Sequence, residues 1–329
     1  MQFTQLARRM GSALLLIWLV VTLTFVLLRL APGDPAAFLL PPGASAADEA
    51  RLRSELGLDR SMPVQYARWI SGMLRGDMGL SFASGRPVAA VLAEAAPISL
   101  LLGGASLALT FLIGVPIGML QAARRGRRTD RVLTVVTTTI YAAPTFWLAL
   151  ALVAVFTYGA ATLGMPAGLR LPAFGVRTPG VSLSGWAGVA DVLRHSILPV
   201  SILAGVGAAG IARYARSSVA DVLAHDFIRT ARAKGLTERV VYRKHVLANI
   251  LPALVVLFAL SLPGLLAGSI FVESVFAWPG LGRTTLNAIL ARDYPVVMAA
   301  TVWYSAAVIL ANLAADLALP LLDPRRQPA

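Results

Sequence analysis

The sequence has 329 residues, of which 57% are hydrophobic and only 14% are charged. A soluble domain has roughly 25% charged residues, so the composition indicates an integral membrane protein. The chain contains no cysteine, which excludes disulfide bonds, thiolate metal sites and cysteine nucleophiles. The net charge of +13 would suggest a nucleic-acid partner on a soluble surface. Here the arginines gather in short loops between apolar segments, as in proteins oriented in a bilayer, so we expect contact with membrane lipid and no nucleic acid.

Six apolar segments reach the roughly 20 residues that a membrane-spanning helix needs. They cover about residues 11–30, 98–122, 132–159, 196–214, 250–272 and 296–319. The first segment could be a cleaved signal peptide. However, its apolar core is longer than the roughly 7–15 residues of such peptides, and Arg29 with Pro32 makes a poor cleavage site. We therefore expect an all-α, polytopic protein with six transmembrane helices and an uncleaved first span.

Basic residues gather on one side of these spans. Arg8 and Arg9 precede the first span, RRGRRTDR (124–131) follows the second, a basic loop (215–249) follows the fourth, and DPRRQPA closes the sequence. Loops rich in arginine and lysine remain in the cytoplasm. Both termini, with the tail 320–329, are thus expected inside.

The segment 31–96 after the N-terminal helix (1–30) is expected outside. DEARLRSELGL (48–58) alternates acids and arginines around leucines, and VQYARWISGML (64–74) has apolar residues at helical spacing. Together they predict a small extracytoplasmic helical segment. A surface loop that only connects two spans is an equally good interpretation.

The loop 215–249 contains signals for two helices. Asp226 is placed to cap a helix that starts at Phe227, and Gly235 is placed to end that helix in the left-handed conformation. Thr237 can cap a second helix, with Glu238 at its positive end. The pattern predicts a helix–glycine–helix elbow that leads into the fifth span.

The first helix of this elbow has a basic side and small residues. Arg229, Arg232 and Lys234 lie along a solvated side, while Ala231 and Ala233 allow close approach of another backbone. A solvated loop that only orients the chain would also explain the charge. Two helices with defined boundaries favour a docking surface, because orientation requires charge but no such geometry.

Several small-residue pairs and prolines lie within the spans. The pairs are Gly114/Gly118, Gly205/Ala209 and Gly264/Gly268, and the prolines are Pro116, Pro199, Pro252 and Pro263. Small residues four apart suit close helix contact, and packing within the chain explains each pair better than a subunit interface. The prolines can kink or start helices.

Together these stretches resemble one family. RTARAKGL (229–236) followed by ANILP (248–252) is similar to the cytoplasmic loop of ABC importer permeases, although Arg229-Thr230-Ala231 replaces the usual Glu-Ala-Ala. Other stretches resemble the dipeptide/oligopeptide/nickel branch, and in particular the first of its two permease subunits. They are LLRLAPGDPA (27–36), LGLDRSMPVQYARWISGMLRGDMGLSF (56–82), RPVAAVLAEAAPISL (86–100), APTFWLAL (143–150), VESVFAWPGLGR (272–283) and ARDYPVV (291–297).

The resemblance implies a type I ABC importer permease fold with a transmembrane core over 97–319. It also implies a second, homologous permease, two ATP-binding subunits and an extracytoplasmic solute-binding protein as partners. The ATPase-coupling residues would be Asp226, Arg229, Thr230, Ala231, Arg232, Ala233, Lys234 and Gly235. ATP and magnesium would bind to the partner subunits, because this chain has no GxxxxGK[ST] phosphate loop and is not expected to be an ATPase.

The resemblance leaves the cargo open between peptides and nickel or another small solute. Glu273 could meet a peptide ammonium group on the substrate path, although structural pairing at a helix end explains it better. His195, His225 and His245 are dispersed, so no metal site is expected. An ion-coupled carrier would have an acid or histidine near a span centre, and a membrane enzyme a catalytic motif. The sequence supports an ion-coupled carrier, a membrane enzyme and a membrane scaffold less well than it supports an ATP-driven importer of the bacterial cytoplasmic membrane.

Overall fold

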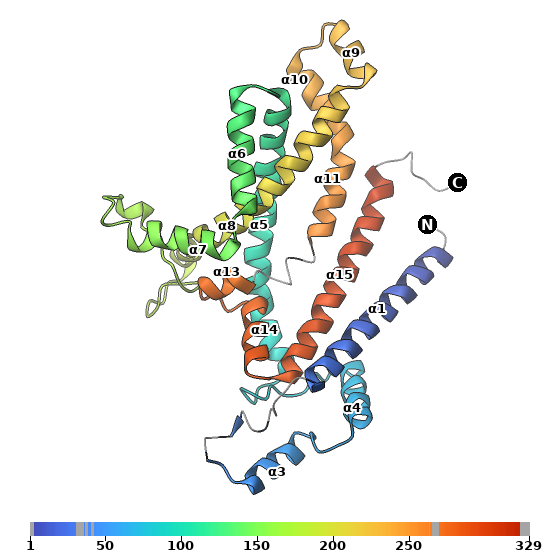
Figure 1. Cartoon of the computed structure of the whole chain (residues 1–329), viewed down its shortest axis with the longest axis vertical. Coiled ribbons are helices and arrows are strands. Elements are labelled where there is room, and N and C mark those ends of the chain that lie inside the picture. The colour runs from blue at the N-terminus through green and yellow to red at the C-terminus, as the bar shows by residue number, and fades with distance from the viewer. Residues whose placement is uncertain are drawn as a thin grey trace. The chain divides into compact units, whose positions relative to one another are not determined.

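The computed structural model describes the backbone of residues 3–30, 36, 39, 40, 43–262, 264 and 270–322. Within these ranges, it describes the side chains of residues 10 to 313. These parts are almost entirely helical (Figure 1), and their β structure is limited to one antiparallel bridge between Leu80 and Pro87. The start of the predicted extracytoplasmic segment, Pro263, Gly268 and the last residues of the tail lie outside the described parts.

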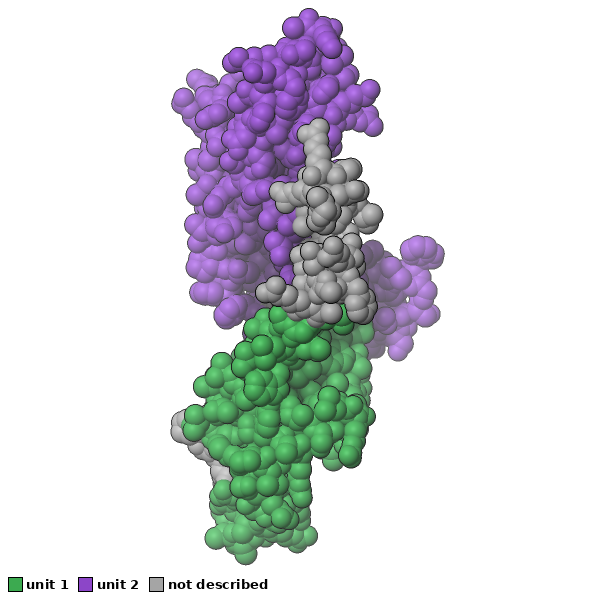
Figure 2. All heavy atoms as spheres, turned by 90° about the vertical axis from the view of Figure 1, so that its right-hand side faces the viewer, with its two compact units in different colours: residues 1–99, 279–309 green, residues 100–278, 310–329 purple. Residues whose placement is uncertain are grey.

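Two compact units make up the chain (Figure 2). Unit 1 contains residues 1–99 and 279–309, and unit 2 contains residues 100–278 and 310–329. Five helical stretches among the described residues are long and apolar enough to cross a membrane, and one bent helix pair brings the number to six. The stretches are Met10–Leu30, Val88–Ala123, Gly185–Leu223, Glu238–Ser261 and Tyr294–Leu313, and the bent pair is Arg128–Ala142 with Thr145–Tyr158.

The bent pair differs from the prediction of one continuous span over 132–159. Helix α6 (Arg128–Ala142) ends before Pro144, and α7 (Thr145–Val153) continues after a bend of 102°. Proline has no N–H to donate and disfavours helical geometry in the residue before it. Ala143 accordingly has an extended conformation, with φ −73° and ψ 137°. The third predicted span is therefore a bent pair of helices, which together make the sixth candidate span.

Three other spans have boundaries that differ from the predicted ones. Helix α5 (Val88–Ala123) begins ten residues before the predicted span 98–122. Helix α8 (Gly185–Leu223) extends beyond 196–214 at both ends and passes through Pro199. The stretch predicted at 250–272 begins at Glu238 instead, and its last helix, α11 (Leu247–Ser261), contains Pro252 and ends at Ser261. Neither proline therefore ends its helix.

In unit 1, both helices predicted in the segment after the first span are present. Helix α3 (Ala46–Glu55) begins with a capping box between Ser45 and Asp48, and α4 (Met62–Leu74) has a proline in its first turn. Helix α4 contacts α1 (Phe3–Leu30) through Tyr66, whose hydroxyl lies 2.6 Å from Thr22 Oγ1 and whose ring meets Phe25 edge-on at 5.2 Å. The segment is thus a folded helical element attached to the first span.

A buried carboxylate joins two distant parts of unit 1. Asp293 lies between α14 (Leu281–Leu290) and α15 (Tyr294–Leu322) and is 2% exposed. It accepts the backbone N–H groups of Phe82, at 3.0 Å, and Ala83, at 3.3 Å, as well as the Ser81 hydroxyl. These bonds compensate for the burial of the charge. They hold the turn around residues 81–83 against the start of α15.

In unit 2, two glycines bring α8 against α5 (Val88–Ala123). A Cβ atom on Gly114 would lie 2.8 Å from the Ala208 carbonyl oxygen, and one on Gly118 would lie 2.4 Å from that of Ala212. Both distances are too short for any side chain, so the two backbones are in direct contact here. A Cβ on Gly205 would meet nothing within 4 Å. The Gly114/Gly118 pair therefore packs within the chain, as expected.

Candidate functional site

The loop between α8 and α11 forms the predicted elbow. Helix α9 (Asp226–Ala233) lies at one end of unit 2 (Figure 1), followed by α10 (Glu238–Val240) and a π-helical turn, η3 (Val241–Val246), that leads directly into α11. Thr237 has the N-cap position of α10, as predicted, although its side chain makes no capping hydrogen bond. The loop is thus regular structure over most of its length.

The beginning of α9 corrects one prediction. Asp226 was expected to be the N-cap, but it is the first helical residue, and His225 has the N-cap position with φ −76° and ψ 147°. Within the first turn, the Asp226 carboxylate still stabilises the positive end of the helix, and it lies 3.4 Å from Arg229. The helix therefore begins one residue earlier than the sequence suggested.

The end of α9 confirms the predicted left-handed conformation of Gly235. Its φ of +79° lies in the left-handed region, which most residues adopt only at a cost. The Gly235 N–H donates to the Arg232 carbonyl at 2.9 Å, and the Leu236 N–H donates to the Ala231 carbonyl at 3.4 Å. This pair of bonds is the Schellman arrangement. It turns the chain sharply from α9 toward α10.

One face of α9 is buried in unit 2. Ile228 is completely buried and Ala231 is 5% exposed, and both pack into a cluster with Val219, Val241 and Val246. Burial of a side chain of the size of isoleucine contributes about 1.5–3 kcal/mol. This cluster joins α9 to the end of α8 and to the turn before α11. Displacement of α9 should therefore move both helices.

The opposite face of α9 is exposed and basic. It carries Arg229, Thr230, Arg232, Ala233 and Lys234. Arg232 is held by Glu238 through two bonds, from Nε at 2.8 Å and from an NH2 group at 3.2 Å. Hydrogen bonding to this carboxylate raises the pKa of the Arg232 guanidinium above its usual value. Arg229 is 79% exposed, and Lys234 makes no ion pair among the described residues. Arg229 and Lys234 are thus the more available cations.

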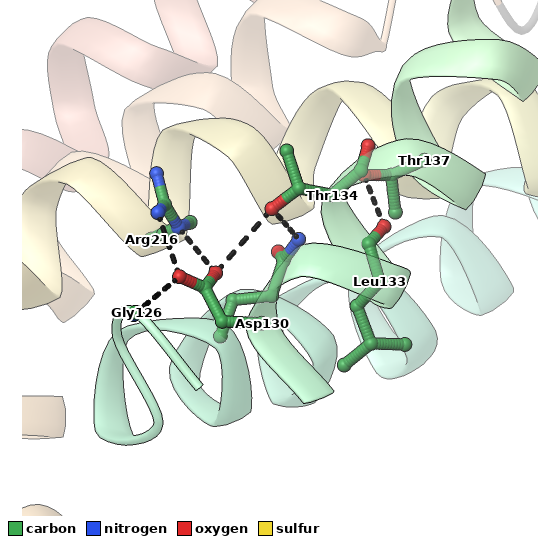
Figure 3. Close-up of polar contacts among 7 residues, drawn as sticks. Gly126, Asp130, Leu133, Thr134, Thr137 and Arg216 are labelled. Carbon is green, nitrogen blue, oxygen red and sulfur yellow. Dashed lines mark hydrogen bonds and ion pairs between the residues drawn. The ribbon is translucent and has the colours of Figure 1, made fainter. Parts of the chain in front are cut away.

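A second polar contact, which sequence reasoning did not identify, lies at the α5–α6 turn (Figure 3). Asp130 is buried and accepts two hydrogen bonds from Arg216 of α8, at 2.9 and 3.0 Å. The same carboxylate accepts the Gly126 N–H at 2.9 Å and the Thr134 hydroxyl at 3.3 Å. Asp130 thereby holds the turn against the last third of α8, ten residues before α9 begins. In the sequence its only signal was an acid within a run of arginines.

Glu273 belongs to the short helix α13 (Ile270–Val275) and is completely buried. Phe276 and Trp278, which follow it, are also completely buried. A solute could reach this carboxyl group only after neighbouring side chains moved. The burial favours the structural alternative for Glu273, and a place on the substrate path stays a prediction.

The sequence matches two family models. Residues 114–328 match the family described as "Binding-protein-dependent transport system inner membrane component", and residues 1–103 match its N-terminal counterpart. The chain is 38% identical to the oligopeptide transport system permease protein AppB of Bacillus subtilis, over 93% of each chain. It is 37% identical to the probable D,D-dipeptide transport system permease protein DdpB of Escherichia coli, over 97% of this chain and 96% of that one.

A further relative and a solved structure agree with these matches. The glutathione transport system permease protein GsiC of Salmonella paratyphi A is 37% identical, over 93% of each chain. The inward-facing MetNI methionine ABC transporter superposes with a TM-score of 0.54 at 20% identity, over 71% of this chain and 96% of that one. At this identity the structural similarity shows the fold alone, which is that of an ABC importer permease. The chain therefore belongs to the family of binding-protein-dependent transport system inner membrane components.

Proposed function

We propose that this chain is one of two homologous permease subunits of an ATP-driven importer that moves di- or oligopeptides into the cytoplasm by alternating access. The peptide cargo is supported by relatives named as oligopeptide, D,D-dipeptide and glutathione permeases. The other subunits would be the second permease, two ATP-binding subunits and an extracytoplasmic solute-binding protein. ATP and Mg²⁺ would bind only to the ATP-binding subunits.

The coupling site of this proposal is the exposed face of α9. The observation that carries it is that α9 has one face buried against the ends of α8 and α11 and the other face free and basic. An ATPase that binds the free face can displace both helices together, because the buried face packs against both. Coupling would use Asp226, Arg229, Thr230, Ala231, Arg232, Ala233, Lys234 and Gly235. Ala231 and Gly235 would shape the helix, and the others would supply contacts.

A cross-linking experiment tests the coupling site. The chain has no cysteine, so Ala233→Cys introduces a single thiol on the exposed face of α9. In the assembled complex we expect this thiol to cross-link to an ATP-binding subunit and the yield to change when ATP binds. Ala47→Cys, on the exposed surface of α3, is the matched control and should give no such product. Equal yields for both variants would contradict the proposal.

A transport assay tests the cargo. The complex, with its binding protein, is reconstituted in proteoliposomes containing ATP, and uptake of labelled dipeptides and of a labelled pentapeptide is measured. We expect ATP-dependent accumulation of at least one peptide class. Accumulation of nickel with no peptide uptake would overturn the peptide cargo but would leave the coupling site intact, because the cross-linking experiment does not depend on the cargo.

A further inference from the structure

A small cavity in unit 2 lies where the end of α5 meets α8. Its volume is about 180 Å³, and its wall includes Arg125 from the α5–α6 turn and Arg213, Arg216, Ser217 and Asp221 from α8. One water molecule takes about 30 Å³ in the liquid, so the cavity has room for a group of several heavy atoms. It is smaller than the roughly 300 Å³ at which small-molecule pockets begin. The cavity suits a compact polar group and excludes a peptide.

The wall of the cavity is positively charged. Asp130 fixes the Arg216 guanidinium (Figure 3), and the Arg213 guanidinium lies 4.6 Å from the centre of the Tyr141 ring. In the part of the chain that the structure describes, neither Arg125 nor Arg213 makes an ion pair. The wall thus contains three arginines and one carboxylate, that of Asp221, while Asp130 lies outside the wall and pairs with Arg216. The surplus charge is positive and favours an anion.

The position of the cavity along the chain identifies the source of that anion. The apolar helix α5 ends at Ala123, and the turn after it contains the run of arginines that predicts the cytoplasmic side. The cavity therefore lies at the cytoplasmic membrane boundary, where lipid phosphates are found.

We propose that this cavity binds the phosphodiester group of an anionic phospholipid in the cytoplasmic leaflet. Guanidinium groups form paired hydrogen bonds with phosphate oxygens, and the Ser217 hydroxyl can add another donor. Basic pockets between transmembrane helices on the cytoplasmic side bind anionic headgroups in the same way. The site is separate from the cargo and from the exposed face of α9. Its occupant would bridge α5 and α8 beside the Asp130–Arg216 ion pair.

Native mass spectrometry of the full-length protein tests the lipid site. The protein is purified in detergent and titrated with phosphatidylglycerol or with phosphatidylcholine. We expect retention of phosphatidylglycerol alone, and a loss of about fivefold in its affinity for each cavity arginine removed in Arg125→Gln and Arg213→Gln. Arg127→Gln and Arg128→Gln are matched controls, because they remove the same charge beside Arg125, from the end of the turn and the first residue of α6, but do not line the cavity. These controls should change the affinity less than twofold.

Other outcomes would overturn the proposal. An equal loss in the control variants would mean a diffuse attraction with no site. Displacement of phosphatidylglycerol by millimolar inorganic phosphate would identify free phosphate as the ligand. If the Arg125→Gln and Arg213→Gln variants retained lipid normally but no longer copurified with the ATP-binding subunits, the cavity would be a contact site for a protein. Arg125→Gln alone decides the question if the Arg213 variant does not fold, because Arg125 lies in an exposed turn.

Discussion

Arg216 of α8 donates two hydrogen bonds to Asp130 at the start of α6, from Nε at 2.9 Å and from an NH2 group at 3.0 Å. The side chain of Asp130 is 5% exposed and that of Arg216 is 36% exposed, so the carboxylate is the buried partner. The pair spans 86 residues of sequence and fixes the end of α8 that leads into α9. We expect it to contribute both to stability and to transmission of movement from α9.

Loss of this carboxylate should destabilise unit 2. In Asp130→Ala, the Gly126 N–H and the Arg216 guanidinium lose their acceptor, which should cost about 1–3 kcal/mol. Thermal unfolding in detergent measures the effect. Arg216→Gln and the double variant complete a double-mutant cycle, in which we expect a coupling energy above about 0.5 kcal/mol. Strict additivity of the two single effects would show that the ion pair contributes nothing.

A side chain on Gly118 should separate α5 from α8. The Cβ atom in Gly118→Ala would lie 2.4 Å from the Ala212 carbonyl oxygen and 2.7 Å from the Ala215 Cβ atom, so the helices must move apart. Overpacking of this kind costs about 1–3 kcal/mol. Gly205→Ala is the matched control, since its Cβ meets nothing within 4 Å, and it should be neutral or slightly stabilising. Similar melting temperatures for the two variants would contradict the direct backbone contact.

Gly235 should be required for coupling because of its backbone conformation. A Cβ atom at this position would meet nothing within 4 Å, so Gly235→Val mainly tests the φ of +79°. We expect ATP-dependent uptake to be abolished while membrane insertion is normal. Gly235→Asn should retain much of the uptake, because asparagine tolerates the left-handed region. Full uptake with valine would mean that the sharp turn after α9 is dispensable.

The two arginines of α9 should differ in what they bind. Arg229→Glu places an acid on the exposed face and should reduce stimulation of the ATPase, if the binding surface of the ATPase is acidic. Arg232 is also bound to Glu238, so Arg232→Glu removes an internal pair as well. The double variant Arg232→Glu/Glu238→Arg restores that internal pair with its charges exchanged. Recovery of uptake in the double variant would show that Arg232 acts only within the elbow. Unchanged assembly of the complex and unchanged stimulation of the ATPase in Arg229→Glu would exclude Arg229 from the contact.

Local features of the site were predictable because they depend on neighbouring residues. The conformation of Gly235 and the N-cap position of Thr237 before α10 follow from capping chemistry within a few positions. The N-cap of α9 was misplaced by one residue, because both His225 and Asp226 are compatible with the start of a helix. Hydrophobicity indicated the spans, but it carries little information on where apolar helices end.

Features that join distant residues could not be predicted in this way. The partners Asp130 and Arg216 lie in separate basic regions, and no local pattern pairs them. The bend at Pro144 was missed for a different reason, since Pro199 and Pro252 lie inside continuous helices and nothing local distinguishes Pro144 from them. Only the fold decides which proline ends a helix.

The contact of Asp293 with residues 81–83 has a consequence for biosynthesis. Chains are made from the N-terminus, so the turn at 81–83 emerges more than 200 residues before the carboxylate that accepts its N–H groups. Until then those groups lack the Asp293 carboxylate, and the segment beyond the first span cannot reach its final structure. A ribosome-bound chain that stops short of residue 293 should leave this segment sensitive to protease, whereas a chain extended through α15 should protect it. A residue at the start of α15 thus completes the folding of a segment made more than 200 residues earlier.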